Sequence, residues 1–179
     1  MFAITPRLVL RPGWPEDAPA LARAIAHKSV VTKLSRVPWP YGQGDAEAFL
    51  ADAWQGSVPR FVITERARDD RPIGCIGLHH DHDLPELGYW LTPEVWGRGY
   101  ATEAGNAVVA LARDSLRLPR LRASWLAGNP ASGRVLSKLG FVATGRVVPQ
   151  PSRALGHDVD TVEMLLDFDA DEPRMPIAA

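Results

Sequence analysis

A pair of glycines ahead of an amphipathic segment is the part of the chain best suited to chemistry. Trp96-Gly97-Arg98-Gly99-Tyr100 follows a short apolar stretch and precedes a long run with helical spacing. Glycine accepts positive φ angles and lets a ligand come close to the backbone. The first amides of a helix lack partners within the helix, and the helix dipole favours negative charge there. These residues therefore predict a phosphate-binding cradle, to which Arg98 can add a charge-assisted contact.

The same turn has other interpretations, which the residues alone leave open. A glycine pair can serve only to reverse the chain. A dinucleotide-binding fingerprint requires a third small residue where Thr102 stands, together with a parallel unit around it. A Walker loop requires Gly-Lys-Ser or Gly-Lys-Thr, and the sequence contains neither. If the turn binds phosphate, it does so as part of a different motif.

The turn must be held between a strand and a helix, and the surrounding pattern supplies both. Apolar runs bounded by polar turns predict strands, and apolar residues at helical spacing predict helices. Asp45 is expected to cap the second helix, while Asn129, Pro130 and Gly140 delimit the fourth. The expected strands are 7–11, 60–65, 73–80, 86–91, 120–126, 141–148 and 158–167, and the expected helices are 15–27, 45–54, 101–116 and 130–139.

The order of these elements predicts an α+β fold built on one mixed sheet. The three strands between residues 60 and 91 are separated by polar turns, which predicts an antiparallel meander. We expect one domain over residues 1–170. Residues 171–179, which include Pro173 and Pro176, are expected to form a loose tail.

The composition is that of a globular protein and argues against several other classes. Of the 179 residues, 46% are hydrophobic and 23% are charged, with a formal net charge of −1. This balance does not favour binding to nucleic acid or to an anionic membrane surface. No stretch approaches the ~20 apolar residues that span a bilayer, and the first residues lack the order of a signal peptide. Cys75 is the only cysteine, so an intramolecular disulfide is impossible and a cytoplasmic protein is expected.

Three ordered blocks of sequence extend the pattern beyond the turn. The first is Thr5-Pro6-Arg7-Leu8-Val9-Leu10-Arg11-Pro12, and the second runs from Glu86 through the turn to Ala104. The third comprises Asn129-Pro130-Ala131-Ser132 and Val135-Leu136-Ser137-Lys138-Leu139-Gly140-Phe141. Together these blocks resemble the GNAT acetyltransferases over roughly residues 5–167. They look most like the RimJ/RimL-type branch, which acetylates protein N-termini and sometimes small amines.

The resemblance implies a GNAT-type, mostly antiparallel sheet of about seven strands flanked by about four helices, with acetyl-CoA as co-substrate and no metal. In that fold the strand ending near Leu91 and the strand 120–126 splay apart, and the thioester enters the gap between them. The pyrophosphate is expected at the glycine turn and the pantetheine arm beside Leu91 and Thr92. The residues expected to contact the cofactor are Leu91, Thr92, Trp96, Gly97, Arg98, Gly99, Tyr100, Ala101, Thr102, Asn129 and Arg134.

Acetyl transfer requires a neutral amine, whereas the thiol leaving group, with a pKa of about 8.5, departs tolerably even without an acid. Glu86 opens the strand that leads to the turn, so it is the leading candidate for a base acting through a water; an ordinary exposed carboxylate is the alternative. Many superfamily members carry an acidic Tyr in the helix after the Asn block, where this sequence has Leu136. Ser132 is the nearest hydroxyl in a matching position and is the candidate acid. A plain polar residue in a first helical turn is the alternative for Ser132.

Two backbone-related roles complete the expected catalytic set. Asn129 is similar to the family residue that binds the CoA arm and is included among the catalytic candidates, although it can also serve as a plain N-cap. An amide donor near Thr92 is expected to stabilise the oxyanion.

Several further side chains allow both a functional and a structural interpretation. Arg134 and Lys138 lie four residues apart on one helix face and can meet the 3′-phosphate of CoA or simply face solvent. Trp39, Tyr41 and Trp54 can line the acceptor mouth or pack as core or lid.

The run His79-His80-Asp81-His82-Asp83 suggests a metal site at first sight. Extended residues alternate sides, so His80 and His82 share one side and His79 lies on the other. No second cluster with zinc spacing is available to complete four ligands. A polar hairpin or part of the acceptor rim is therefore the preferred interpretation.

The sequence thus predicts an N-acetyltransferase that uses acetyl-CoA and a primary amine, in particular a protein or peptide N-terminus. An α-amine has a pKa of about 8 against about 10.4 for lysine, so it needs less help from a base. A small amine such as a polyamine or an antibiotic stays open as acceptor, and Leu136 in place of Tyr keeps a non-catalytic acyl-CoA-binding protein open. We expect no nucleic acid or membrane partner, and the sequence leaves a homodimer open.

Overall fold

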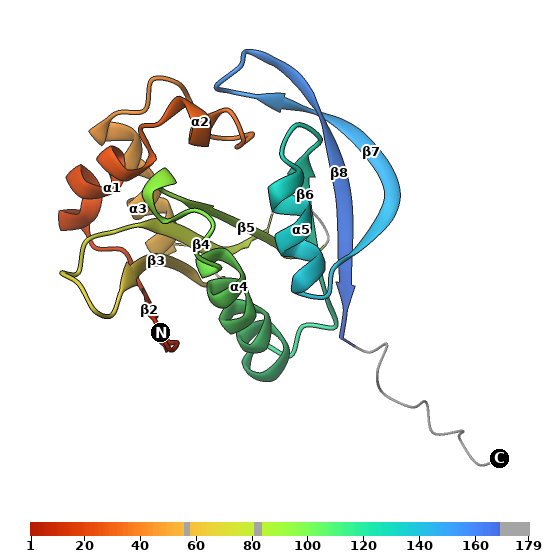
Figure 1. Cartoon of the computed structure of the whole chain (residues 1–179), viewed down its shortest axis with the longest axis horizontal. Coiled ribbons are helices and arrows are strands. Elements are labelled where there is room, and N and C mark those ends of the chain that lie inside the picture. Colours follow the sequence, from red (N-terminus) through yellow and green to blue (C-terminus); the bar gives the residue numbers. More distant parts are fainter. Residues whose placement is uncertain (56–57, 81–83, 169–179) are drawn as a thin grey trace.

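A mixed sheet organises the structure, a computed structural model that describes residues 1–55, 58–80 and 84–168. The strand order is β1-β2-β3-β4-β5-β6-β8-β7, and Figure 1 shows β7 and β8 curving together along one side of the molecule. Strands β3 and β4 are almost wholly buried, and their central residues are apolar or glycine. The strands are β1 (Ala3–Ile4), β2 (Leu8–Arg11), β3 (Arg60–Glu65), β4 (Gly74–His79), β5 (Glu86–Leu91), β6 (Arg120–Leu126), β7 (Val142–Ser152) and β8 (His157–Asp167).

The β5–β6 pair gives the sheet its functional feature. It is parallel, whereas the other neighbouring strands pair antiparallel. Its ladder contains only Glu86 with Arg122 and Leu87 with Ala123, although β5 continues to Leu91 and β6 to Leu126. The two strands therefore separate beyond Leu87, as the predicted splay requires.

Helices cover the two faces of the sheet with separate apolar clusters. On the α5 face, helices α4 (Tyr100–Ala110) and α5 (Pro130–Lys138) pack against the side of β5 and β6 that carries Leu87 and Ala123. On the α1 face, helices α1 (Ala18–Ile25) and α3 (Gln43–Gln55) pack against Val62 and Cys75. The apolar surroundings of Cys75 raise the pKa of its thiol through burial, which leaves it a core residue rather than a nucleophile. The α+β layer structure predicted from the element order is confirmed.

The structure adds short elements that the sequence pattern did not predict. Strand β1 brings the sheet to eight strands, and helix α2 (Lys28–Val31) follows α1. The third predicted helix divides into α4 and a π-helical turn, η3 (Leu111–Ser115). Two 3-10 turns, η1 (Pro15–Asp17) and η2 (Pro93–Val95), precede α1 and the glycine turn. Within the described ranges, no helix combines the length and apolar character needed to cross a membrane.

One predicted cap was wrong, and three predictions fall outside what the structure describes. Helix α3 begins at Gln43, and the Asp45 carboxylate accepts a hydrogen bond from the Gly42 amide at 2.9 Å, so Asp45 lies inside the first turn rather than at its N-cap. The predicted tail at 171–179, the Trp54 side chain and the segment 81–83 of the histidine run lie outside the described residues.

Candidate active site

The glycine turn has the backbone geometry that its sequence predicted. Gly97 and Gly99 adopt φ angles of +76° and +78°, and Gly99 is the N-cap of α4. A Cβ at Gly97 would meet no heavy atom within 4 Å, and one at Gly99 would meet only Arg7 Nη2, at 3.6 Å. The turn therefore exposes its backbone at the N-terminus of a helix, where the amides of the first turn favour an anion.

Charged side chains on neighbouring strands fix the conformation of this turn. The Tyr100 hydroxyl donates to the buried Glu65 carboxylate at 2.8 Å, and Arg98 lies 3.8 Å from the same carboxylate. Arg7 donates to the Arg98 carbonyl at 2.9 Å and lies 4.6 Å from the Tyr100 ring centroid. Glu103 accepts hydrogen bonds from Thr5 and Arg7 at 2.6 Å each. The opening strand of the chain thus holds the start of α4 in place.

This supporting set was not predicted from the sequence, because its members come from the turn between β1 and β2, from β3, from the glycine turn and from α4. Burial opposes ionisation of Glu103, but the hydrogen bonds from Thr5 and Arg7 lower its pKa below the ordinary value. The side chain therefore stays charged near neutral pH. The only signal of this contact with α4 in the sequence was a pair of polar residues, Thr5 and Arg7, in the block that resembles the opening strand.

The orientation of the β5 backbone determines which amides face the gap. The Thr92 amide donates to the Ile73 carbonyl at 2.9 Å, on the β4 side, whereas the Pro85 carbonyl accepts from Arg122 on the β6 side at 3.0 Å. Since successive residues of a strand direct their backbone groups to opposite sides, Tyr89 and Leu91 direct theirs toward β6. The β5–β6 ladder has ended before both residues. Their amides therefore border the gap.

This orientation narrows the choice of oxyanion donor expected near Thr92. The Thr92 amide is engaged by β4 and does not face the gap, so a donor on β5 must come from Tyr89 or Leu91. The Thr92 hydroxyl hydrogen-bonds to Glu94. The indole of Trp96 donates to the Leu91 carbonyl at 2.8 Å, which closes the loop between β5 and the turn. Trp96 thus shapes the mouth of the gap through its indole nitrogen.

Glu86 lies where the two strands begin to separate. Its carboxylate accepts a hydrogen bond from the Ser124 hydroxyl and lies 3.9 Å from Nε of Arg122. Arg122 in turn approaches Glu163 on β8 at 3.3 Å. The Glu86 side chain is only 11% exposed, so the alternative of an ordinary exposed carboxylate is wrong.

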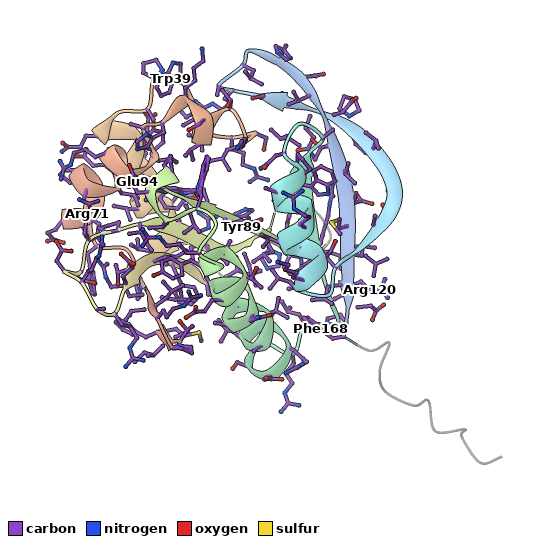
Figure 2. The ribbon with its side chains drawn as sticks, in the orientation of Figure 1. Trp39, Arg71, Tyr89, Glu94, Arg120 and Phe168 are labelled. Atoms are coloured by element: carbon purple, nitrogen blue, oxygen red, sulfur yellow. The ribbon has the colours of Figure 1, made fainter. Side chains whose placement is uncertain are left out.

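Tyr89 and Ser132 meet across the opposite face of the sheet. Tyr89 is three residues beyond Glu86, so its side chain points to the α5 face, where its hydroxyl lies 2.9 Å from Ser132 Oγ. Figure 2 labels Tyr89, which lies between the ribbons of β5 and α5. Burial raises the pKa of the Tyr89 phenol, and the hydrogen bond with Ser132 partly offsets that increase. Ser132 is therefore more than a solvated first-turn residue. Sequence reasoning missed the contact of Tyr89 with Ser132. The only signal was that Tyr89 alternates along β5 with Leu87 and Leu91 and therefore shares their face of the sheet.

The other predicted cofactor residues lie around α5 and α4. Asn129 is the N-cap of α5 by position, but its side chain makes no capping hydrogen bond within the described chain, which leaves its amide available to a ligand. Arg134 and Lys138 are exposed on α5. A groove of about 750 Å³ runs past the start of α4 to α5 and is lined by Ile4, Thr5, Pro6, Gly99, Thr102, Glu103, Asn106, Ala107 and Lys138. Ala101 lies in the first turn of α4, half-buried.

The β7–β8 hairpin contacts the segment between α2 and α3. The Arg153 amide donates to the Ser35 carbonyl at 2.9 Å, and its guanidinium reaches the Arg36 carbonyl at 3.4 Å. In Figure 1 the tip of this hairpin reaches toward α2. Trp39, labelled in Figure 2, is 42% exposed on the loop between α2 and α3, whereas Tyr41 packs against the apolar clusters beside α1 and α2.

The histidine run gives no metal centre within the part of the chain that the structure describes. No group of three or more His, Cys, Asp or Glu side chains in that part is arranged to hold a metal ion. The ring of His79 instead lies against Gly88, where a Cβ would approach its Nε2 to 2.5 Å. This close packing makes His79 a structural neighbour of Glu86, its partner in the β4–β5 ladder.

Comparison with known proteins agrees with this geometry. The family model described as the acetyltransferase (GNAT) domain matches residues 7–142. YoaA of Bacillus subtilis strain 168, named an uncharacterized N-acetyltransferase, is 38% identical over 155 residues, which cover 81% of this chain and 86% of the relative.

Two solved structures share the fold at lower sequence identity. A GNAT-family acetyltransferase from Bacillus anthracis has a TM-score of 0.80 at 20% identity, covering 93% of this chain and 98% of that one. The complex of RimL, a ribosomal L7/L12 alpha-N-protein acetyltransferase, with coenzyme A has a TM-score of 0.79 at 18% identity, covering 96% and 100%. The family match contains the splayed strand pair and the glycine turn in full, and the chain is therefore an acetyltransferase of the GNAT family.

Proposed function

We propose that this chain transfers the acetyl group of acetyl-CoA to the α-amine of a protein or peptide N-terminus. The observation that carries the proposal is the gap between β5 and β6, which opens at Leu87 and leads to the glycine turn. A gap bordered by backbone amides at one end and by a helix N-terminus at the other suits a long, phosphate-bearing thioester.

The described residues fit the parts of acetyl-CoA in that order. The amides from Gly99 to Thr102 would receive the pyrophosphate, because they begin α4 and the turn before them is open. Arg98 would neutralise phosphate charge, and Trp96 would border the arm. The side-chain amide of Asn129 would bind the arm from the α5 side, and Arg134 would meet the 3′-phosphate.

Bound acetyl-CoA supplies an electrophilic carbonyl and a thiolate leaving group. The amides of Tyr89 and Leu91 face the gap, so one of them can donate to the carbonyl oxygen and stabilise its developing charge. Glu86 lies on the α1 face at the vertex of the gap, where it can take the proton of the amine through a water. Ser132 lies on the α5 face, where it can serve protonation of the sulfur. The base and the acid thus reach the reaction from opposite faces of the sheet.

An N-terminal acceptor is supported by the acid–base requirement and by one structural relative. An α-amine is neutral in part near neutral pH, so one carboxylate acting through a water suffices to complete its deprotonation. RimL, which shares the fold, is named for acetylation of an alpha-amine on a ribosomal protein. Glu86 and Glu163 also provide carboxylates beside which an ammonium group can dock before it loses its proton.

A matched set of acceptors tests this proposal. Peptides of one sequence with an internal lysine would be supplied with a free or a blocked N-terminus, alongside a polyamine, and release of CoA thiol would be followed. We expect turnover only with the free N-terminus, and mass spectrometry should place the acetyl group on the α-amine. Turnover with the polyamine alone would shift the acceptor to small amines, and turnover with no amine despite CoA binding would contradict acetyl transfer.

A further inference from the structure

Two hydroxyl groups meet on the α5 face where the gap opens, and only one of them was expected there. Tyr89 is the second residue beyond the last β5–β6 pair, and its hydroxyl reaches across to α5. The hydroxyl lies 2.9 Å from Ser132 Oγ and 3.5 Å from the Ser132 carbonyl. The phenol of Tyr89 therefore extends from β5 to α5 beside the gap between β5 and β6.

Helix α5 itself offers no phenol at this place. Leu136, at the position where the resemblance implies a tyrosine, is 1% exposed and packs in the main apolar cluster. The Leu136 side chain faces the interior and carries no hydroxyl, so α5 supplies no phenol here. Tyr89 brings a phenol to the same space from the strand side.

We infer that the hydroxyl of Tyr89 is the acid that protonates the leaving CoA thiolate, with Ser132 as the relay that restores its proton. The inference rests on the proposed acetyl transfer and assigns a residue to the step in which the CoA thiolate leaves. In that step the amine nitrogen forms a bond to the acetyl carbon, and the carbon–sulfur bond breaks. The amine proton leaves through water to Glu86. The sulfur takes the Tyr89 proton, and a solvent proton reaches the Tyr89 oxygen through the Ser132 hydroxyl, which accepts one proton as it passes on its own.

The relative acidity of the groups decides between Tyr89 and Ser132 as the direct donor. A phenol with a pKa of about 10 is about 30-fold less acidic than a thiol with a pKa of about 8.5, so proton transfer to the thiolate is only slightly uphill. An aliphatic hydroxyl is a far weaker acid than a phenol. Burial raises the pKa of Tyr89, but the hydrogen bond with Ser132 stabilises the phenolate and acts in the other direction. Ser132 therefore serves better as partner and relay.

The first experiment measures the contact between Tyr89 and sulfur without turnover. Dissociation constants of CoA and of desulfo-CoA, which lacks the sulfur, would be measured for the wild type, Tyr89→Phe and Ser132→Ala. We expect the wild type to prefer CoA by about fivefold or more, and Tyr89→Phe to lose that preference while keeping its affinity for desulfo-CoA. An equal preference in the wild type and Tyr89→Phe would overturn the inference. A purely structural role of Tyr89 would weaken both ligands together and would overturn it as well.

The second experiment separates the catalytic step from binding. Tyr89→Phe should lower kcat by about 100-fold with the KM for acetyl-CoA within about twofold, and Ser132→Ala should lower kcat less. Ser137→Ala removes a hydroxyl from the same helix, one that donates to the Gly133 carbonyl at 3.0 Å, and should retain wild-type kcat. A smaller loss in Tyr89→Phe than in Ser132→Ala would assign the acid to Ser132 and contradict the inference.

The two experiments also distinguish failure of the inference from failure of the proposed function. If the wild type acetylates amines and Tyr89→Phe is as active, only the assignment of Tyr89 fails. If the wild type acetylates no amine, acetyl transfer fails, and the CoA and desulfo-CoA affinities still decide whether Tyr89 contacts the sulfur.

Discussion

Glu86 owes its suitability as a base to its position at the vertex of the gap. It is buried, accepts a hydrogen bond from Ser124 and lies beside Arg122, so its carboxylate is fixed in orientation. Replacing Glu86 with Gln keeps the shape and removes the proton acceptor. We expect kcat to fall by about 100-fold, with CoA affinity within twofold of the wild type. Glu47→Gln, the same change on the exposed face of α3, is the control, and full activity of Glu86→Gln would remove this residue as the base.

A side chain introduced at Gly99 tests whether the glycine turn binds the phosphates of CoA. At a φ of +78°, a valine costs roughly 1–2 kcal/mol of backbone strain and fills the space in front of the helical amides. Gly99→Val should therefore weaken CoA binding by tenfold or more, measured by calorimetry. Gly145→Val carries the same backbone strain, at a φ of +82° on β7, and should lose stability without losing CoA affinity. Equal affinities in both variants would place the phosphates elsewhere.

At the residue scale, the sequence predicted the open backbone of the glycine turn but missed the contact between Tyr89 and Ser132. The glycines, the helix behind them and the opening residue of β5 are local features that a single segment displays. The contact between Tyr89 and Ser132 joins residues 43 positions apart, and it depends on the register of β5 against α5. No spacing along the chain encodes that register. The engagement of the Thr92 amide by Ile73 was missed for the same reason.

At the scale of elements, a buried ion pair joins strand β2 to the turn that begins the first helical layer. Arg11 donates to both oxygens of Asp17, at 2.7 and 2.8 Å, and Asp17 also accepts from the Trp14 amide. Burial alone would raise the pKa of Asp17, but the hydrogen bonds from Arg11 and Trp14 lower it below its ordinary value of 3.8. The pair therefore stabilises the fold while Asp17 is ionised.

This pair predicts a pH-dependent stability difference. Asp17→Asn leaves a buried guanidinium with a weaker partner and should lower the free energy of unfolding by about 3 kcal/mol at pH 7, measured in urea. Because the folded pKa is depressed, the stabilisation is fully present above the unfolded value of about 3.9 and is lost as the pH falls through the folded value. The difference between wild type and variant should therefore shrink below about pH 4. Glu16→Gln, at the preceding and exposed position, is the control and should change neither the free energy of unfolding nor its pH dependence. A difference between wild type and Asp17→Asn that does not vary with pH would contradict the role of Asp17.

Elements with strong local signals were predicted to within a residue or two. The bounds of β3, β5 and β6 match the predicted ranges, because polar or turn-forming residues flank the apolar residues of each strand. Strand β1 and helix α2 were missed because each spans only about one period of its pattern, at two and four residues, so no repeat is visible in the sequence. Their formation depends on β2 and on the apolar cluster below α2.

At the scale of the whole molecule, the proposed function places the two substrates on opposite faces of the sheet. The glycine turn leads into α4, which packs with α5 on one face, and the β7–β8 hairpin contacts the α2–α3 loop beside the apolar cluster of the other face. The gap between β5 and β6 is the place where the two faces connect through the sheet. In the proposed reaction, an amine approaches the thioester from the face opposite to the α5 helix.

The account rests on acetyl-CoA entering that gap, so the most direct test is a crystal structure of the wild-type protein with CoA. We predict the pyrophosphate on the amides from Gly99 to Thr102, the pantetheine arm between β5 and β6 within hydrogen-bonding reach of the Tyr89 or Leu91 amide, and the sulfur beside the Tyr89 hydroxyl. A CoA molecule bound with its arm outside the gap, or with its pyrophosphate away from the start of α4, would contradict the account.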